Sequence, residues 1–239
     1  MPQNTFDERI AATYEAKWPE LFEPAAIEPV VDFLAGQVGD GAALEFGVGT
    51  GRIAVPLRRR GVPVHGIDLS RPMAARVPPG EGVEVIIGDF ATTRVAGPFR
   101  LVYLVRNTIT NLTAQDEQVA CFRNAAAHLE PGGRFVVEVY VPRLRRLPPG
   151  QTVHPFTVTP GHLGFEEYDF TAQLARSHHY WVVDGTLETY STPHRYVWPA
   201  ELDLMARLAG LTLHERWASW TREPFTGDSE AHVSVWRKP

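Results

Sequence analysis

A short apolar stretch leads directly into a glycine-rich turn that opens a helix, and this arrangement constrains the fold more than any other segment. The segment reads Leu44-Glu45-Phe46-Gly47-Val48-Gly49-Thr50-Gly51-Arg52. Glycine is needed where the backbone takes a positive φ or approaches a ligand too closely for a Cβ atom. A dinucleotide-binding fingerprint has its third glycine three residues after the second, whereas here it comes two residues after. The segment therefore predicts either a ligand site of another kind or a glycine turn without a ligand.

Strand-like and helix-like segments alternate from residue 42 to residue 141. Extended segments are expected over 42–46, 62–67, 83–87, 101–105 and 134–141, and helices over 52–60, 72–77 and 115–129. Segments 83–87 and 101–105 are nearly continuous apolar runs, which is typical of strands covered by helices on both faces. The alternation predicts an α/β fold with parallel strands joined by crossover helices.

The two ends of the chain depart from this alternation. Residues 6–37 carry a helical apolar pattern in which Pro19, Pro24 and Pro29 mark breaks or first turns, so we expect an N-terminal layer of helices. After Pro142 the chain becomes rich in turn residues over 148–160.

The region over 163–196 is polar, aromatic and β-like, with a hairpin turn expected at Asp184-Gly185-Thr186. A helix over 199–209 and strands near 211–217 and 231–236 are expected to complete the chain. We expect one domain over residues 1–239, in which about residues 143–197 form a small antiparallel β insertion that caps the substrate.

The composition is that of a folded protein without a strong charge preference. Hydrophobic residues make up 44% and charged residues 21% of the chain, and the formal net charge is −5. This charge gives no general attraction to phosphate backbones or anionic membranes, so neither nucleic acid nor a membrane is expected as a partner. The single cysteine, Cys121, falls in a helical pattern and is interpreted as a buried apolar residue. Residues 1–9 lack the pattern of a signal peptide, which predicts a cytoplasmic protein.

The glycine turn resembles the first motif of the class I S-adenosylmethionine-dependent methyltransferases, acidic-x-Gly-x-Gly-x-Gly, with Glu45 as its acidic residue. Later segments resemble further motifs of the same family. Asp68 ends the second extended segment, where the family's acidic side chain accepts hydrogen bonds from both ribose hydroxyls. Gly88-Asp89-Phe90 ends the third, where the resemblance implies an aspartate at the adenine amino group and an apolar neighbour stacked on the ring. Pro131-Gly132-Gly133 resembles the family's turn before the fifth strand. These matches follow the family order over roughly residues 10–141.

The resemblance implies a Rossmann-like sheet of seven mostly parallel strands with the last antiparallel. It implies S-adenosyl-L-methionine as the cofactor and S-adenosyl-L-homocysteine as the product. More loosely, the layout resembles small bacterial methyltransferases of secondary metabolism that carry a β insertion before the final helix. Tyr14 lies where such enzymes place an aromatic lid residue, although a core role fits equally. The expected cofactor-binding residues are Tyr14, Glu45, Gly47, Gly49, Thr50, Gly51, Arg52, Asp68, Leu69, Met73, Gly88, Asp89, Phe90, Arg106 and Asn107.

The expected reaction is methyl transfer to an N or O atom of a small-molecule acceptor. Because the sulfonium is already a strong electrophile, the protein needs chiefly to align a nucleophile with the methyl carbon. Thr108, Tyr140 and Arg143 follow the fourth and fifth strands, at the edge where ligands of such folds bind, and we expect them to contact the substrate. His178, His179 and Tyr140 are the candidates for a base that removes a proton from the acceptor, with packed or solvated histidines as the alternative.

Several alternatives follow from the same residues. Metal-dependent relatives carry a carboxylate after the fourth strand, where this chain has Arg106 and Asn107, so no metal is expected. A non-catalytic S-adenosylmethionine-binding regulatory or scaffold protein would share the cofactor motif and is the main alternative. A nicotinamide oxidoreductase is disfavoured by the glycine spacing. The basic run at Arg143, Arg145 and Arg146 is compatible with a carboxylate or phosphate on the substrate. The aromatic insertion suits either a lid over an apolar substrate or the surface of a homodimer.

Overall fold

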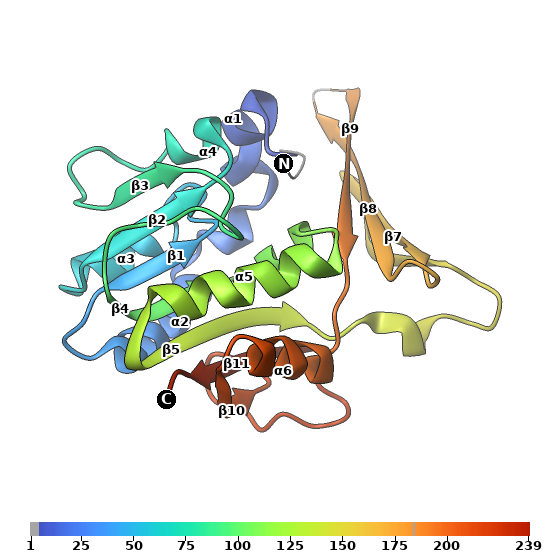
Figure 1. Ribbon diagram of the computed structural model, residues 1–239. Helices are drawn as coiled ribbons and strands as arrows, with labels where there is room; N and C mark the ends of the chain where they lie inside the picture. Colours follow the sequence, from blue (N-terminus) through green and yellow to red (C-terminus); the bar gives the residue numbers. More distant parts are fainter. Residues whose placement is uncertain (1–4, 184) are drawn as a thin grey trace.

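A seven-stranded sheet forms the centre of the protein, described by a computed structural model over residues 5–183 and 185–239 (Figure 1). Its strands are β1 (Ala43–Phe46), β2 (Val64–Asp68), β3 (Glu84–Ile87), β4 (Phe99–Leu104), β5 (Leu129–Tyr140), β10 (Thr212–Trp217) and β11 (Ala231–Arg237). They lie in the order β10-β11-β5-β4-β1-β2-β3. Strands β1 to β5 pair in parallel, and β11 runs antiparallel to both of its neighbours, β10 and β5. The expected mostly parallel sheet with an antiparallel last strand is confirmed.

Helices cover both faces of this sheet. They are α1 (Glu8–Lys17), α2 (Pro24–Val38), α3 (Ala54–Arg59), α4 (Arg71–Ala74), α5 (Gln115–His128) and α6 (Pro199–Leu208), with short 3-10 helices η1 (Pro19–Leu21), η2 (Thr108–Asn111) and η3 (Arg143–Arg146). Side chains alternate across a strand, so Leu44 and Phe46 pack in the core with α5 and α6, while Ala43 packs with α2 and α3. The buried Cys121 lies in the α5 layer, as expected.

The insertion between β5 and α6 is a separate antiparallel sheet. It consists of β6 (Val153–Thr159), β7 (His162–Asp169), β8 (Leu174–Val183) and β9 (Thr186–Arg195), paired in that order. Figure 1 shows β7, β8 and β9 beside the end of the main sheet toward which the β5 arrow points. Gly185 has a φ of 75° between β8 and β9, consistent with the expected hairpin, whereas Asp184 of that turn and residues 1–4 lie outside the described residues.

The turn-rich region over 148–160 contains the strand β6, and Pro155 is tolerated because β6 lies at the sheet edge, where its register shifts after that residue. Two local expectations are wrong, each for a reason visible in the packing. Pro29 lies inside α2 instead of breaking it, because α2 buries an apolar face in the core. The turn at Pro131-Gly132-Gly133 is absorbed into β5, whose pairing with β4 is irregular there.

Within the described ranges, no helix is long and apolar enough to cross a membrane.

The antiparallel strand β11 is fully integrated into the core. Trp236 is 0% exposed and packs edge-on against Phe122, with ring centroids 5.3 Å apart. Its indole Nε1 donates a hydrogen bond of 3.0 Å to Asp203 Oδ1 on α6.

We expect Trp236→Ala to lower the free energy of unfolding by about 3–5 kcal/mol, because it opens a cavity in a packed aromatic cluster. The matched control is Trp198→Ala, since Trp198 is 38% exposed and its truncation leaves the core intact. Urea unfolding followed by circular dichroism measures both variants. Equal losses in the two would contradict the assignment of β11 to the core.

Candidate functional site

Two adjoining cavities lie at the carboxyl ends of the parallel strands, where ligands of open α/β sheets bind. The smaller cavity, of about 180 Å³, has Asp68, Leu69, Asp89 and Phe90 in its wall. The larger, of about 430 Å³, extends from the glycine turn to the insertion. Both cavities share lining residues, which are Phe6, Tyr14, Gly47, Gly49, Met73, Thr108 and Asn111. The two cavities therefore form one cleft with a narrow end and a wide end.

The glycine turn between β1 and α3 forms the floor of the cleft. Gly47 has a φ of 73°, and a Cβ atom there would lie 2.6 Å from Thr108 Cγ2. Both facts require glycine at this position. Thr50 also lines the larger cavity. Gly51 and Gly88 line neither cavity and instead pack against Val55 and Thr93, respectively.

Asp68, at the end of β2, holds this turn in place. Its Oδ2 accepts a hydrogen bond of 2.7 Å from the Gly49 amide, and its Oδ1 accepts one of 2.8 Å from the Ser70 amide. Burial raises the pKa of the Asp68 carboxyl, while these two hydrogen bonds oppose the shift. The sequence predicted a ligand contact here, but it gave no sign that the same carboxylate orders the turn.

Glu45 and Arg52 bring one buried and one half-buried ionisable group to the larger cavity. Glu45 is 2% exposed, and burial raises its pKa to about 8 although Tyr103 donates a hydrogen bond of 3.0 Å to it. Burial lowers the pKa of Arg52, whose Nη1 donates to the Leu21 carbonyl at 3.2 Å. Among the described residues, no ion pair includes Arg52. A guanidinium in this setting can bind a carboxylate that enters the cleft.

The narrow end of the cleft has the shape and chemistry of a small aromatic pocket. Phe90 lines it and stacks on Phe46, with ring centroids 5.8 Å apart. Asp89 lines it as well, and its Oδ1 accepts a hydrogen bond of 2.8 Å from the Ala91 amide. Leu69 and Met73 supply further apolar wall.

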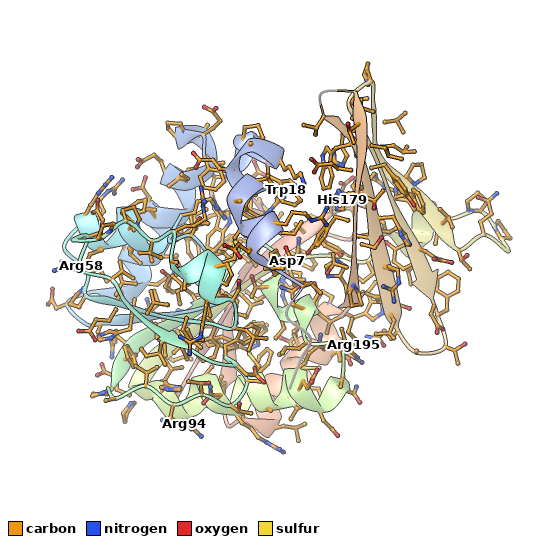
Figure 2. All side chains as sticks on the ribbon, turned by 90° about the horizontal axis from the view of Figure 1, so that it is seen from above. Asp7, Trp18, Arg58, Arg94, His179 and Arg195 are labelled. Atoms are coloured by element: carbon orange, nitrogen blue, oxygen red, sulfur yellow. The ribbon has the colours of Figure 1, made fainter. Side chains whose placement is uncertain are left out.

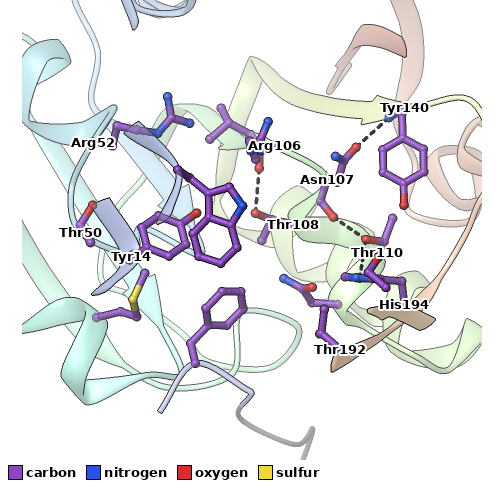
Figure 3. Close-up of a pocket in the computed structure, with 18 of the residues that line it drawn as sticks. Tyr14, Thr50, Arg52, Arg106, Asn107, Thr108, Thr110, Tyr140, Thr192 and His194 are labelled. Carbon is purple, nitrogen blue, oxygen red and sulfur yellow. Dashed lines mark hydrogen bonds between the residues drawn. The ribbon is translucent and has the colours of Figure 1, made fainter. Parts of the chain in front are cut away.

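The segment after β4 has an unusual backbone. Arg106 and Asn107 have φ values of 55° and 59°, a conformation that residues other than glycine seldom adopt and that often marks a functional site. Glu138 on β5 stabilises it, since its Oε2 accepts a hydrogen bond of 2.6 Å from the Arg106 amide. Asn107 Oδ1 accepts one of 2.8 Å from the Tyr140 amide. Arg106, Asn107 and Thr108 all line the larger cavity (Figure 3).

The inner face of the insertion forms the opposite wall of the larger cavity. Figure 2 shows Trp18, which follows α1, and His179 of β8 close together, and their ring centroids are 5.9 Å apart in an edge-on contact. His179 lines the cavity, whereas His178 lies on the other face of the sheet, with Nδ1 2.9 Å from Ser191 Oγ. The expected alternation of this pair is confirmed. Of the two histidines among the base candidates, the structure places only His179 at the cleft.

Tyr140 lines the cavity but is unsuited to act as a base. Its hydroxyl donates a hydrogen bond of 3.2 Å to Glu166 Oε1, and burial, together with the Glu166 charge, raises its pKa well above the ordinary value. The phenol therefore keeps its proton at neutral pH. Arg143 also lines the cavity, with its Nη2 3.7 Å from Glu230 Oε2. Arg145 and Arg146 contact Gly227 and Glu230 and do not line it.

Several lining residues were not anticipated from the sequence. They are Phe6, Trp18, Val48, Ile53, Val105, Thr110, Asn111, Phe156, Glu166, Ser177, Tyr190, Thr192 and His194. The insertion members follow a period of two on β7, β8 and β9, in register with His179. That alternation was a usable signal once His179 had been placed facing inward.

Comparisons with known proteins identify the family of the chain. Residues 43–133 match the family described as a methyltransferase domain. The chain is 28% identical to the cypemycin N-terminal methyltransferase of Streptomyces sp over 241 residues, covering 91% of this chain and 97% of that protein. The structure of the CcbJ methyltransferase from Streptomyces caelestis has a TM-score of 0.86 and 35% identity, with 98% of each chain covered. CalS10, an amino pentose methyltransferase from Micromonospora echinaspora, has a TM-score of 0.73 at 21% identity over 95% of this chain and 96% of its own.

The fold is thus that of Rossmann-like methyltransferases. The chain belongs to the class I S-adenosylmethionine-dependent methyltransferases and is an enzyme of that family. As a member of this family it uses S-adenosyl-L-methionine as its cofactor, and the product formed from the cofactor is S-adenosyl-L-homocysteine.

The histidines of the cleft predict a loss of stability in mild acid. Burial lowers the pKa values of His179 and His194 to about 4 each, from an ordinary value of 6.5, and neighbouring histidines add to the shift at His179. Between these values the unfolded chain binds more protons than the folded chain, so the free energy of unfolding falls as pH falls from 6.5 toward 4.

We expect the double variant His179→Gln/His194→Gln to show a flatter decline in Tm over that range than the wild type, measured by scanning calorimetry. The variant His214→Gln is the control because His214 is exposed, and it should follow the wild type. If the Tm of the double variant falls with pH as steeply as that of the wild type, the two imidazoles already carry a proton in the folded protein.

Proposed function

We propose that this methyltransferase transfers the methyl group to an N or O atom of a small-molecule acceptor that binds in the larger cavity. The supporting observation is that the cleft continues beyond its narrow end into about 430 Å³ of space with polar and aromatic walls. A regulatory or scaffold protein that only bound the cofactor would need no second enclosed space of this kind. The insertion acts as the cap of the acceptor site, since its inner face lines that space.

The cofactor roles proposed for individual residues follow their places in the cleft. Asp68 accepts hydrogen bonds from the ribose hydroxyls, and Asp89 and Phe90 hold the adenine in the smaller cavity. Arg52 binds the carboxylate of the methionine moiety, which would compensate its half-buried charge. The remaining contacts come from the turn and the cleft wall, at Tyr14, Glu45, Gly47, Gly49, Thr50, Leu69, Met73, Arg106 and Asn107.

The chemistry in this proposal depends mainly on alignment. The cofactor supplies an electrophilic methyl group on a sulfonium. Thr108 and Asn107 border the larger cavity where it meets the smaller one, and they orient the acceptor there. Tyr14 and Trp18 of the N-terminal layer cover the cleft and exclude water. His179 and His194 are neutral at pH 7, so they can accept hydrogen bonds from the acceptor molecule. Because their pKa values are about 4, they do not keep a proton taken from that molecule.

The names of two similar proteins favour nitrogen as the acceptor atom. One is called an N-terminal methyltransferase, and another is an amino pentose methyltransferase. For this chain, nitrogen is therefore the acceptor atom to test before oxygen.

The first experiment is calorimetric titration with S-adenosylmethionine, S-adenosylhomocysteine and NAD. We expect the first two to bind with about micromolar affinity and NAD not to bind. Transfer of a radiolabelled methyl group to amine and alcohol acceptors then tests turnover. Tight cofactor binding without transfer to any acceptor would favour the non-catalytic alternative.

The variant Asp68→Asn tests the proposed ribose contact. It replaces a charged acceptor with a neutral one, and we expect S-adenosylhomocysteine to bind about 10- to 100-fold more weakly. The control is Asp40→Asn, because Asp40 is exposed, lines neither cavity and precedes β1, at the end of that strand opposite the glycine turn. Unchanged affinity in Asp68→Asn would remove this carboxylate from the cofactor site.

A further inference from the structure

Glu166 on β7 is a buried carboxylate for which the cofactor proposal has no use. It is 9% exposed and lines the larger cavity. Its Oε1 accepts hydrogen bonds of 3.2 Å from the Tyr140 hydroxyl and 3.4 Å from the Ser177 hydroxyl, and its Oε2 accepts one from the Tyr168 hydroxyl. An ionised carboxylate has about four acceptor positions. Three neutral donors thus leave the carboxylate with acceptor capacity and bring no positive charge to it.

Among the described residues, no cation forms an ion pair with this carboxylate. Arg143 lies on the same cavity wall, and its charge opposes the rise in the pKa values of Tyr140 and Tyr168, but the ion pair that it forms is with Glu230. The imidazoles of His179 and His194 face the same space, and burial keeps both of them neutral at pH 7. A buried carboxylate without a cationic partner is costly, so its retention in a cavity wall points to a cation that arrives from outside.

The surroundings of Glu166 suit a cation of organic type. Trp18, Tyr14 and Phe156 line the same cavity, and aromatic faces attract ammonium groups. Glu166 accepts hydrogen bonds from three hydroxyl groups, so its oxygens act as acceptors in the cavity wall and suit an N–H donor of a cation.

We propose that Glu166 anchors a cationic amine of the acceptor, so that the substrate class is a small primary or secondary amine that is protonated in water. A nitrogen that is to be methylated would first release its proton to water, because only the neutral amine is a nucleophile. This inference rests on the proposed function, because it assigns the acceptor of that same cavity. Glu166 is then a specificity-determining residue that binds the acceptor by an ion pair.

The test uses pairs of probes in which a charged amino group replaces a hydroxyl group. Each probe is added to the complex of the protein with S-adenosylhomocysteine. The pairs are benzylamine with benzyl alcohol and D-glucosamine with D-glucose, measured by calorimetry. We expect at least one amine to bind the wild type about tenfold more tightly than its uncharged partner. The variant Glu166→Gln should lose this preference.

The matched control is Glu167→Gln. Glu167 is the next residue on β7, faces the opposite side of the sheet, and has Oε2 3.4 Å from His178 Nε2. This control makes the same change of charge one residue away, and it should keep the preference for amines. Equal binding of amines and alcohols, binding of no amine at all, or an amine preference retained in Glu166→Gln would each overturn the inference.

Stability gives a second readout that needs no acceptor. If Glu166 is retained for binding, Glu166→Gln removes an uncompensated buried charge, and its Tm should equal or exceed that of the wild type. A clearly lower Tm would assign Glu166 a structural role and contradict the proposal.

Binding of S-adenosylhomocysteine is measured first. Absence of this binding would contradict the proposed function, whereas normal cofactor binding without a preference for amines would contradict only the role proposed for Glu166.

Discussion

The hydrogen bond from the Gly49 amide to Asp68 Oδ2, 2.7 Å long, joins the two strand ends from which the cleft is built. The Gly47 and Val48 amides reinforce it by donating to the Ile67 carbonyl at 2.8 and 3.1 Å. Thr108, from the end of β4, packs against Gly47 from the other side, where a Cβ atom would not fit. The turn is thereby fixed between two strands before any ligand binds. Such prior order reduces the entropy that binding must overcome.

A second chain of contacts connects this turn region with the insertion. Asn107 accepts a hydrogen bond from the Tyr140 amide, and the Tyr140 hydroxyl donates to Glu166. The left-handed backbone at Asn107 is thus coupled through one tyrosine to the carboxylate in the cap. On the other side, α1 contacts the insertion through the ion pair of Lys17 with Glu188 at 2.7 Å and through aromatic edges. These contacts are far fewer than those of a strand ladder, as is usual for elements that cover a binding site.

The sheet and the cofactor side of the cleft could be predicted because their signals are local. Buried parallel strands are apolar runs, and the turn after β1 needs glycine in a fixed spacing. Glu166 could not be found in this way, because its role depends on which face of the insertion points inward. That orientation is set by the pairing of β7 with β8, a contact between segments whose register the sequence pattern alone does not fix. For the same reason, Tyr140 was expected to contact the substrate or act as a base, whereas the structure gives it Glu166 as a partner.

The two ends of the larger cavity differ in charge, and this difference bears on how an acceptor would be oriented. Arg52 and Arg106 lie on the wall near the glycine turn, while Glu166 lies on the insertion wall. On the proposed function, the carboxylate of the cofactor binds at the cationic wall and an amine at the anionic one. A site arranged in this way selects by electrostatic complementarity, which contributes more to specificity and orientation than to affinity. Because the transfer needs alignment more than acid–base chemistry, a fixed orientation is the contribution that such a cleft can make to the rate.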